Sequence, residues 1–269
     1  FGLWAEQLIA ESLGKDCKGI VPIVSEPLLA ANHYGSDRFF VYLRMEGDDN
    51  TTTDEAVHQF VEGGHPVIRF DLQDRYDLGA EFFRWEFATA VAGAIISVNP
   101  FDQPNVQTSK DITDSVLDHY RVTGKLPNGV FESTVQELLD SITEGDYLSV
   151  MAYLRQSPEI DQALETLRRR VLEKHGIATT FGYGPRFLHS TGQLHKGGPP
   201  SGVFLQITMS HHEDIPIPGY PFSFGTLAEA QALGDREALA STGRRVARLH
   251  LDSDIATGIL ELANEIAEQ

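Results

Sequence analysis

The chain has little cysteine, few basic residues and no long apolar run, and each shortage excludes a class of protein. One cysteine, Cys17, among 269 residues excludes an internal disulfide and fits a reducing cytosol. Without a bilayer-length apolar run or a signal peptide, we expect a cytoplasmic protein with no membrane partner. The 21 basic and 39 acidic residues give a net charge of −18, which argues against nucleic acid as a partner.

Motifs for binding cofactors are missing as well. The sequence holds neither a Gly-x-x-x-x-Gly-Lys phosphate loop nor a dinucleotide fingerprint. His211-His212-Glu213 could suggest a metal-dependent isomerase, but adjacent residues of a strand point to opposite faces and cannot easily share an ion. The nearby prolines favour an exposed loop at 211–224 instead. We therefore expect no metal and no other cofactor.

The composition that is present suits a globular core. Hydrophobic residues make up 41% and charged residues 22% of the chain, which is ordinary for a folded protein. The first residues, Phe1-Gly2-Leu3-Trp4, resemble the middle of a helix, and no methionine precedes them. We therefore expect a fragment or a processed product of a longer protein.

Apolar runs of strand length alternate with segments of helical periodicity. The predicted strands are Ile20–Val24, Phe39–Leu43, Val67–Leu72, Ala94–Val98, Tyr147–Leu154, Thr179–Tyr183, Val203–Thr208 and Val246–Leu251. The predicted helices are a first one ending at Leu13, then Thr53–Glu62, Leu78–Ala92, Val106–Thr123, Val135–Ile142, Pro158–His175 and one near Asp254–Ala267. This pattern predicts an α/β fold of doubly wound, mostly parallel three-layer sheets. A Gly-, Pro- and Asn-containing turn at 124–129 predicts two consecutive α/β units, 1–126 and 127–269.

The stretch from Gly93 to Lys110 carries the strongest functional signal. Gln103 directly precedes Pro104, so Gln103 is pushed out of the α region and Pro104 suits the first helical position. Lys110 lies about two helical turns further on. An amide, a cation and unpaired backbone N–H groups at one predicted strand-to-helix junction favour an anionic or oxygen-rich ligand.

Glu11 lies in the last turn of the first predicted helix, which Gly14 ends. A carboxylate there faces the negative end of the helix dipole, which suits a base that removes a proton next to a carbonyl group. Position alone favours a different interpretation, a solvated surface glutamate or an i,i+4 pair with Lys15.

Both segments resemble motifs of the phosphoglucose isomerase family. The family's carboxy-terminal signature is matched at Phe101, Asp102, Gln103, Val106 and Lys110, with Asn105 in place of glycine and Gln107 in place of glutamate. Its Glu-Ser-Asn-Gly-Lys motif, which carries the catalytic glutamate, is matched at Glu11, Ser12, Gly14 and Lys15, with Leu13 in place of asparagine. Asn-Pro-Phe-Asp-Gln-Pro-Asn-Val is similar to the isomerase part of fused transaldolase/phosphoglucose isomerases.

A third, displaced resemblance lies in Gly182–Gly198. The family's ring-opening histidine occurs in a similar unit of glycine turn and helix, where His189 takes its place and Gln193-Leu194-His195 follows. In the family this unit lies between the other two motifs, where this chain has no good match, although His33 lies there unassigned. The unit is either relocated in this branch or a generic sugar-phosphate loop, and we favour relocation.

The resemblance implies an enzyme that interconverts glucose 6-phosphate and fructose 6-phosphate through a cis-enediol without a metal, on sugar-isomerase (SIS) α/β units. It implies catalytic roles for Glu11, Lys110 and His189, and substrate binding by Gln103, Lys15, Arg186 and Gln193. The cations available to hold an anionic substrate are Lys15, Lys18, Lys110, Arg186 and Lys196. The family's phosphate-gripping loop belongs to an earlier unit that has no counterpart here. We therefore expect an upstream isomerase unit and a transaldolase region in the parent chain, which could also form a homo-oligomer.

Two rival functions remain open. A non-catalytic sugar-phosphate-binding module on the same fold would bind hexose phosphate and signal to a partner. Retention of Glu11 together with Lys110 speaks against this module, because sensing needs no base. Transaldolase itself needs a Schiff-base lysine inside a β/α barrel, and the doubly wound pattern offers no eight-fold barrel.

Overall fold

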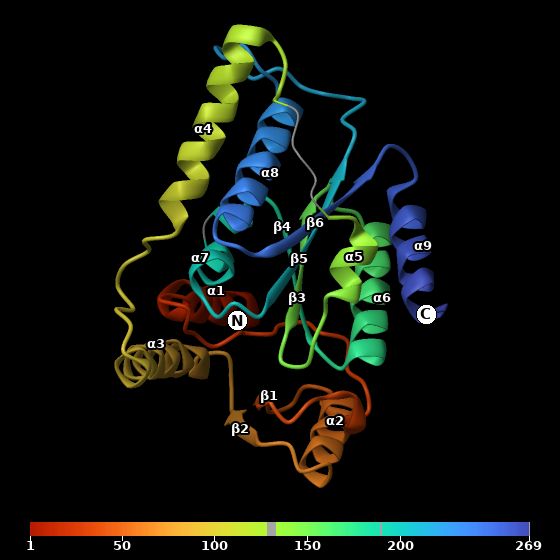
Figure 1. The fold of residues 1–269 in the computed structure, drawn as a ribbon. Helices are drawn as coiled ribbons and strands as arrows, with labels where there is room; N and C mark the ends of the chain where they lie inside the picture. The colour runs from red at the N-terminus through yellow and green to blue at the C-terminus, as the bar shows by residue number, and fades with distance from the viewer. Residues whose placement is uncertain (128–132, 189, 269) are drawn as a thin grey trace.

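The computed structural model describes residues 1–127, 133–188 and 190–268, and its second half is built on one parallel sheet (Figure 1). The four strands lie in the order β4-β3-β5-β6, and each neighbouring pair is parallel. Their bounds are β3 Tyr147–Tyr153, β4 Ala178–Tyr183, β5 Gly202–Met209 and β6 Arg245–Leu251. Helices connect successive strands, as parallel neighbours require.

Helices cover both faces of this sheet (Figure 1). The helices on one face are α5 (Val135–Asp140), α6 (Pro158–His175) and α9 (Ile255–Glu268). The opposite face is covered by α7 (Ser190–Gly197) and α8 (Phe224–Ser241). Alternate residues of β3 serve the two faces, since Leu148 and Val150 belong to the first apolar cluster and Met151 to the second. The predicted three-layer α/β fold is thereby confirmed.

The first half of the chain adds helices to the α7/α8 side. α1 (Gly2–Leu13) contacts α7, and α4 (Val106–Thr123) runs alongside α8 (Figure 1). α3 (Asp77–Ile96) packs against α1, where the Trp4 and Phe82 rings lie 4.5 Å apart. β1 (Phe40–Met45) and β2 (Val67–Leu72) form a separate two-stranded parallel sheet, joined by α2 (Thr51–Glu62). Two short 3-10 turns are η1 (Ala31–His33) and η2 (Arg186–Leu188).

Local chemistry explains where several helices begin and end. Ser157 caps α6 by accepting a hydrogen bond from the Ile160 N–H at 3.3 Å, and proline occupies the first helical position. Gly176 ends the same helix with a φ of 65°, a conformation that suits glycine. Gly124 ends α4 in the same way, with a φ of 69°.

Most predicted elements are confirmed, but two predicted strands are wrong. Ala94–Val98 does not form a strand, because α3 continues to Ile96 and ends at Ser97 in the left-handed conformation. A short apolar run cannot by itself distinguish a strand from a helix. Ile20–Val24 is not assigned to a strand, and the Val24 carbonyl accepts a hydrogen bond from the Arg168 guanidinium at 3.3 Å.

The division into units at 126 stays a prediction. The helices on either side of it are in contact, since α4 packs on α8 and α1 on α7. Within the described residues, no helix is both long and apolar enough to cross a membrane. The expected cytoplasmic location also stays a prediction.

Candidate functional site

The last turn of α1 and the turn before α4 meet, which brings two of the sequence motifs together. The Gln103 side-chain amide donates a hydrogen bond to Glu11 Oε1, although the two residues are 92 positions apart. Gln7, one turn earlier on α1, donates to Glu11 Oε2 at 3.2 Å. The carboxylate is half-buried and held by two amides. Among the described residues it forms no ion pair with Lys15, which lies beyond the end of the helix.

Lys15 binds the turn that leads to Gln103. Its side chain is almost fully buried, and its ammonium lies 2.9 Å from Asp102 Oδ1 and also donates to the Asn99 carbonyl. Hydrogen bonds from Lys15 and from Asn99 hold the pKa of the Asp102 carboxyl below its usual value. Lys18 adds a bond to the Ile96 carbonyl at 3.0 Å. These two lysines tie the segment after α3 to the segment after α1.

Gln193, on α7, lies under the same junction. Its side-chain amide donates to the Gly14 carbonyl and to Asn105 Oδ1, both at 2.8 Å, and its oxygen accepts from the Asn105 N–H at 2.9 Å. The side chain is fully buried. All three bonds are to protein groups, and its predicted contact with substrate stays untested.

Arg186 pairs with a carboxylate that the sequence analysis does not identify. Its guanidinium lies 2.7 Å from Glu6 Oε2 and donates to the Leu3 carbonyl at 3.1 Å. Burial raises the pKa of Glu6, against the opposing charges of Arg186 and Arg168. No sequence spacing signals this pair, because the partners are 180 positions apart, and the predicted contact of Arg186 with substrate stays untested.

Lys110 lies in the second turn of α4 and is half-buried. Within the part of the chain that the structure describes, it makes no hydrogen bond or ion pair. The neighbouring Ser109 points the other way, into the protein, and donates to Asp235 at 3.2 Å. Lys110 is therefore available to an anionic ligand, whereas Lys15, Arg186 and Lys196 already have carboxylate partners.

Of the two histidines in the third motif, the structure describes only His195. His189 lies outside the described residues, so its predicted role in ring opening stays a prediction. His195 is buried among aromatic rings, 5.8 Å from Phe187 and 5.1 Å from Phe204 between ring centroids. Burial lowers the pKa of His195 to about 3, so its imidazole is neutral near pH 7. The neutral imidazole of His195, enclosed by aromatic rings, therefore contributes to core packing.

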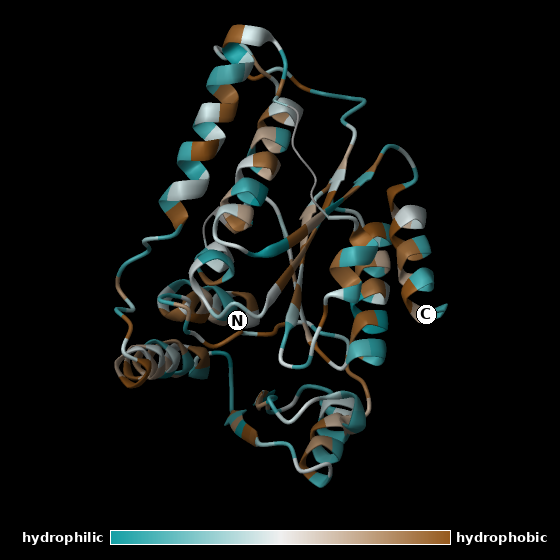
Figure 2. Cartoon of the chain, viewed as in Figure 1, coloured by the Kyte–Doolittle hydropathy of each residue, from teal (hydrophilic) through white to brown (hydrophobic). Residues whose placement is uncertain are grey.

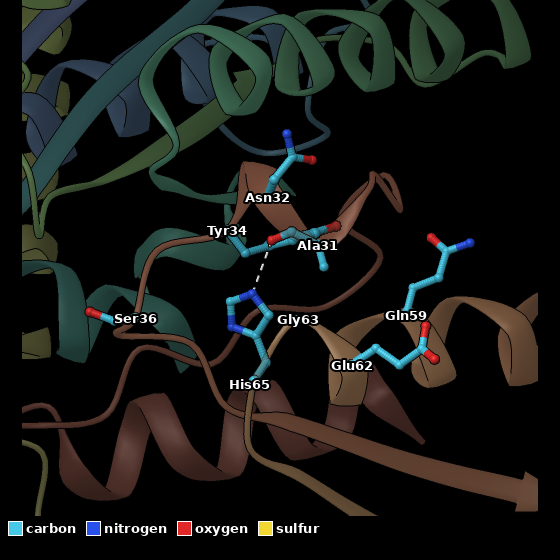
Figure 3. A pocket seen from close by; sticks show the side chains of 9 residues that line it. Ala31, Asn32, Tyr34, Ser36, Gln59, Glu62, Gly63 and His65 are labelled. Carbon is cyan, nitrogen blue, oxygen red and sulfur yellow. Dashed lines mark hydrogen bonds between the residues drawn. The ribbon is translucent and has the colours of Figure 1, made fainter.

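A shallow pocket of about 690 Å³ lies elsewhere, between η1 and the end of α2 (Figure 3). Figure 3 shows His65 reaching across to the Ala31 carbonyl, with Glu62 and Gln59 at the rim. The lining contains no lysine or arginine and shares no residue with the Glu11 junction. It gives a sugar phosphate no permanent positive charge.

Metal-binding groups do not gather in the described ranges 1–127, 133–188 and 190–268. No three His, Cys, Asp or Glu side chains lie close enough there to hold an ion. Within the His211-His212-Glu213 run, the His212 ring bonds to the Asp252 carbonyl at 2.8 Å.

Comparisons with known proteins reveal partial similarity. No family model matches the chain. Glucose-6-phosphate isomerase from Streptococcus pyogenes serotype M18 (strain MGAS8232) is 29% identical over 146 residues, which cover 41% of this chain and 32% of that protein. The enzyme of the same name from Streptococcus agalactiae serotype III (strain NEM316) is 30% identical with the same coverage. The chain thus spans about a third of the length of these relatives.

A solved structure also superposes on the chain. The crystal structure of a hypothetical protein, TT0462, from Thermus thermophilus gives a TM-score of 0.43 at 14% identity, covering 99% of this chain and 75% of that one. The sequence similarity to the streptococcal enzymes supports a relationship to the glucose-6-phosphate isomerase family. It does not extend to a transaldolase region.

Proposed function

We propose that this chain carries part of the active site of an aldose–ketose isomerase that interconverts glucose 6-phosphate and fructose 6-phosphate. One observation carries the proposal: the amide of Gln103 holds the carboxylate of Glu11, so two segments that separately resemble isomerase motifs form one site. The partial identity with two glucose-6-phosphate isomerases supports the same reaction.

In this reaction Glu11 serves as the base. Its carboxylate takes the proton from C2 of the open-chain aldose, and the C–H electron pair forms the C1–C2 double bond of the enediol. The π electron pair of the C1 carbonyl moves to the C1 oxygen, which takes a proton from solvent. The C2 hydroxyl then releases its proton to solvent and forms the ketone, while the C1–C2 double-bond pair takes the proton that Glu11 returns to C1. Gln103 orients the carboxylate, and the positive charge of Lys110 stabilises the developing enediolate in a partly dry site.

Replacement of Glu11 by glutamine tests the proposal in an active parent protein. Glu11→Gln keeps the size of the side chain and removes the base, so kcat should fall on the order of 10²- to 10⁴-fold. Binding of a hydroxamate or aldonate analogue of the enediolate should survive. Glu46→Gln, an exposed glutamate after β1, is the matched control for loss of one carboxylate. Near-normal turnover by Glu11→Gln would exclude Glu11 as the base.

The rival binding module has one observation in its favour. Lys15, Arg186 and Lys196 are each paired with a carboxylate within the protein, which leaves few cations for a catalytic site. A binding module would take up hexose 6-phosphate without exchanging its C2 proton for solvent. An assay of deuterium exchange at C2 of the open-chain sugar distinguishes the two functions. An enzyme exchanges this proton and loses the exchange in Glu11→Gln, whereas a binding module shows no exchange.

We also propose that an upstream isomerase unit of the parent chain supplies the grip on the phosphate. The chain spans about a third of the streptococcal enzymes, and its own cations near the junction are mostly committed to protein partners. The unit would cover the site and hold the phosphate, while this chain supplies the base.

A further inference from the structure

We propose that Gln193 is a positioning residue that sets the spacing between the Glu11 and Gln103 segments. The inference rests on the proposed function, in which these two side chains share one site. Gly14 lies three positions after Glu11, and Asn105 lies two positions after Gln103. Gln193 bonds to both of these flanking residues and to neither Glu11 nor Gln103 among its described contacts.

The bonds of Gln193 restrain backbone as well as side chains. Its amide nitrogen donates to the Gly14 carbonyl at 2.8 Å, and its oxygen accepts from the Asn105 N–H at 2.9 Å. A single planar group therefore connects the end of α1 to the start of α4. Because the amide is rigid, the two segments cannot separate without breaking at least one bond. The Glu11–Gln103 contact, on the more exposed side of the same junction, inherits that spacing.

The surroundings of Gln193 leave no room for adjustment. A Cβ added at Gly197 would clash with Asn105 Oδ1 and would lie 2.8 Å from the Gly14 carbonyl oxygen. A Cβ added at Gly14 would clash with Leu194 Cα. The Cys17 N–H donates to the Gly197 carbonyl at 2.9 Å. The three segments thus approach at backbone distance, as a precise junction requires.

Burial separates a positioning role from a direct contact with sugar. The Gln193 side chain is 0% exposed, and both its nitrogen and its oxygen are bonded to protein. A ligand could reach the amide only after breaking these bonds. The Asn105 side chain accepts one of these bonds. Asn105 stands where the isomerase signature has glycine, which has no side chain to accept it, so the signature does not predict this bond.

The test uses Gln193→Met, which keeps the length of the side chain and removes its hydrogen bonds. The matched control is Gln206→Met, because Gln206 is also 0% exposed and donates to one carbonyl, that of Ala232 at 2.8 Å, away from the junction. Amide hydrogen exchange is measured by mass spectrometry on peptides covering 10–19 and 99–108. We expect exchange in both peptides to accelerate at least about 10-fold in Gln193→Met, since the restraint between the segments is lost, and to stay at the wild-type rate in Gln206→Met.

Turnover in an active parent protein supplies the second readout. A displacement of about 1 Å at the reacting groups lowers kcat by up to about 100-fold, with little change in KM. We expect this split for Gln193→Met and near-normal kcat for Gln206→Met. A raised KM with unchanged kcat, or wild-type exchange in both peptides, would overturn the positioning role.

Asn105→Gly keeps the test valid if Gln193→Met does not fold. This change removes the Asn105 side chain, and with it the Oδ1 acceptor, keeps the backbone N–H that donates to Gln193, and introduces the residue of the isomerase signature. We expect a smaller acceleration of exchange in the same two peptides, and no acceleration would contradict the proposal. The exchange readout needs no turnover, so it can succeed or fail independently of the Glu11→Gln experiment.

Discussion

At the scale of single residues, Lys110 differs from the other cations near the junction in having no bonded partner among the described residues. Lys15 is paired with Asp102 and Arg186 with Glu6, so their charges are largely neutralised where they lie. A partly buried ammonium without a carboxylate partner interacts more strongly with a developing negative charge than a paired one does. We therefore propose Lys110 as the cation of the site that acts on substrate.

Lys110→Ala should lower turnover of ring-closed glucose 6-phosphate by about 10- to 1,000-fold, because removing one preorganised electrostatic contact costs a few kcal/mol of transition-state stabilisation. Turnover of the open-chain sugar should fall less if Lys110 also assists ring opening. Lys125→Ala, at an exposed position just past the far end of α4, removes the same charge as a control. Equal losses on both sugars would indicate general electrostatics, and no loss would remove Lys110 from the site.

Sequence reasoning at this scale works where a motif is contiguous and fails where partners are distant. The resemblance singles out Glu11 and Gln103, which the structure places in contact. The spacing of Glu11 and Lys15 suggests an i,i+4 pair, but the helix ends at Leu13 and Lys15 turns to Asp102 instead. The Glu6–Arg186 pair has no local signal, since only the fold brings α1 and η2 together.

At the scale of helices and strands, the apolar pattern predicts the central sheet well because its strands are buried on both faces. Every residue of β3 is buried, and its sequence is apolar except for Ser149 and the hydroxyls of its two tyrosines. α8 is not predicted, since its buried residues are mostly small or polar, including Gly234 and Asp235, with Leu233 and Leu239 as the large apolar ones. Asp235 is fully buried because Lys196 lies 2.6 Å away, and such compensation by a distant cation is invisible in a hydrophobic pattern.

The carboxylate of Asp146 makes the stability of the central sheet depend on pH. Asp146, just before β3, bonds to Arg245 at the start of β6 at 2.6 and 2.9 Å, and it accepts from the Thr143 N–H at 2.7 Å. Burial acts to raise the pKa of Asp146, but hydrogen bonds from Arg245 and Thr143 outweigh it and lower the pKa below its usual value. The resulting stability is present above the unfolded pKa of about 3.9 and is lost as the pH falls through the folded value.

Asp146→Asn should therefore reduce the free energy of unfolding at pH 7 by about 1–3 kcal/mol, because Arg245 loses its charged partner. The variant should also lose less stability than wild type between about pH 5 and about pH 2, since one titrating group is gone. Urea unfolding at a series of pH values measures both effects. Asp118→Asn, whose partner Arg121 is nearly half exposed, is the control and should change little. Parallel pH profiles for wild type and Asp146→Asn would contradict the assignment.

At the scale of the whole molecule, α3 presents an apolar face that nothing in the described structure covers. Phe83, Phe87, Val91 and Ile95 repeat every four residues and are 71, 63, 41 and 76% exposed. Hydrophobic residues are visible on α3 in Figure 2, away from the helices that cover the sheet. An apolar stripe of this kind marks an interaction site, and it ends where Lys15 and Lys18 bind the following turn. A partner on α3 would therefore border the Glu11 junction.

We propose that the upstream isomerase unit occupies this stripe, because the related enzymes are about three times as long as the matched part and the phosphate grip is still to be supplied. The chain alone should then turn over hexose 6-phosphate at least about 100-fold more slowly than a mixture with the separately expressed unit, since groups missing from the site cost that much or more. Phe87→Glu places a charge in the stripe and should abolish this complementation, since a buried unpaired carboxylate is costly.

Val122→Glu, at an 87% exposed position on α4, makes the same chemical change outside the stripe and should complement normally. Full activity of the chain alone, or equal complementation by both variants, would contradict the docking role. Self-association that Phe87→Glu abolishes without affecting complementation would assign the stripe to a second copy of the chain.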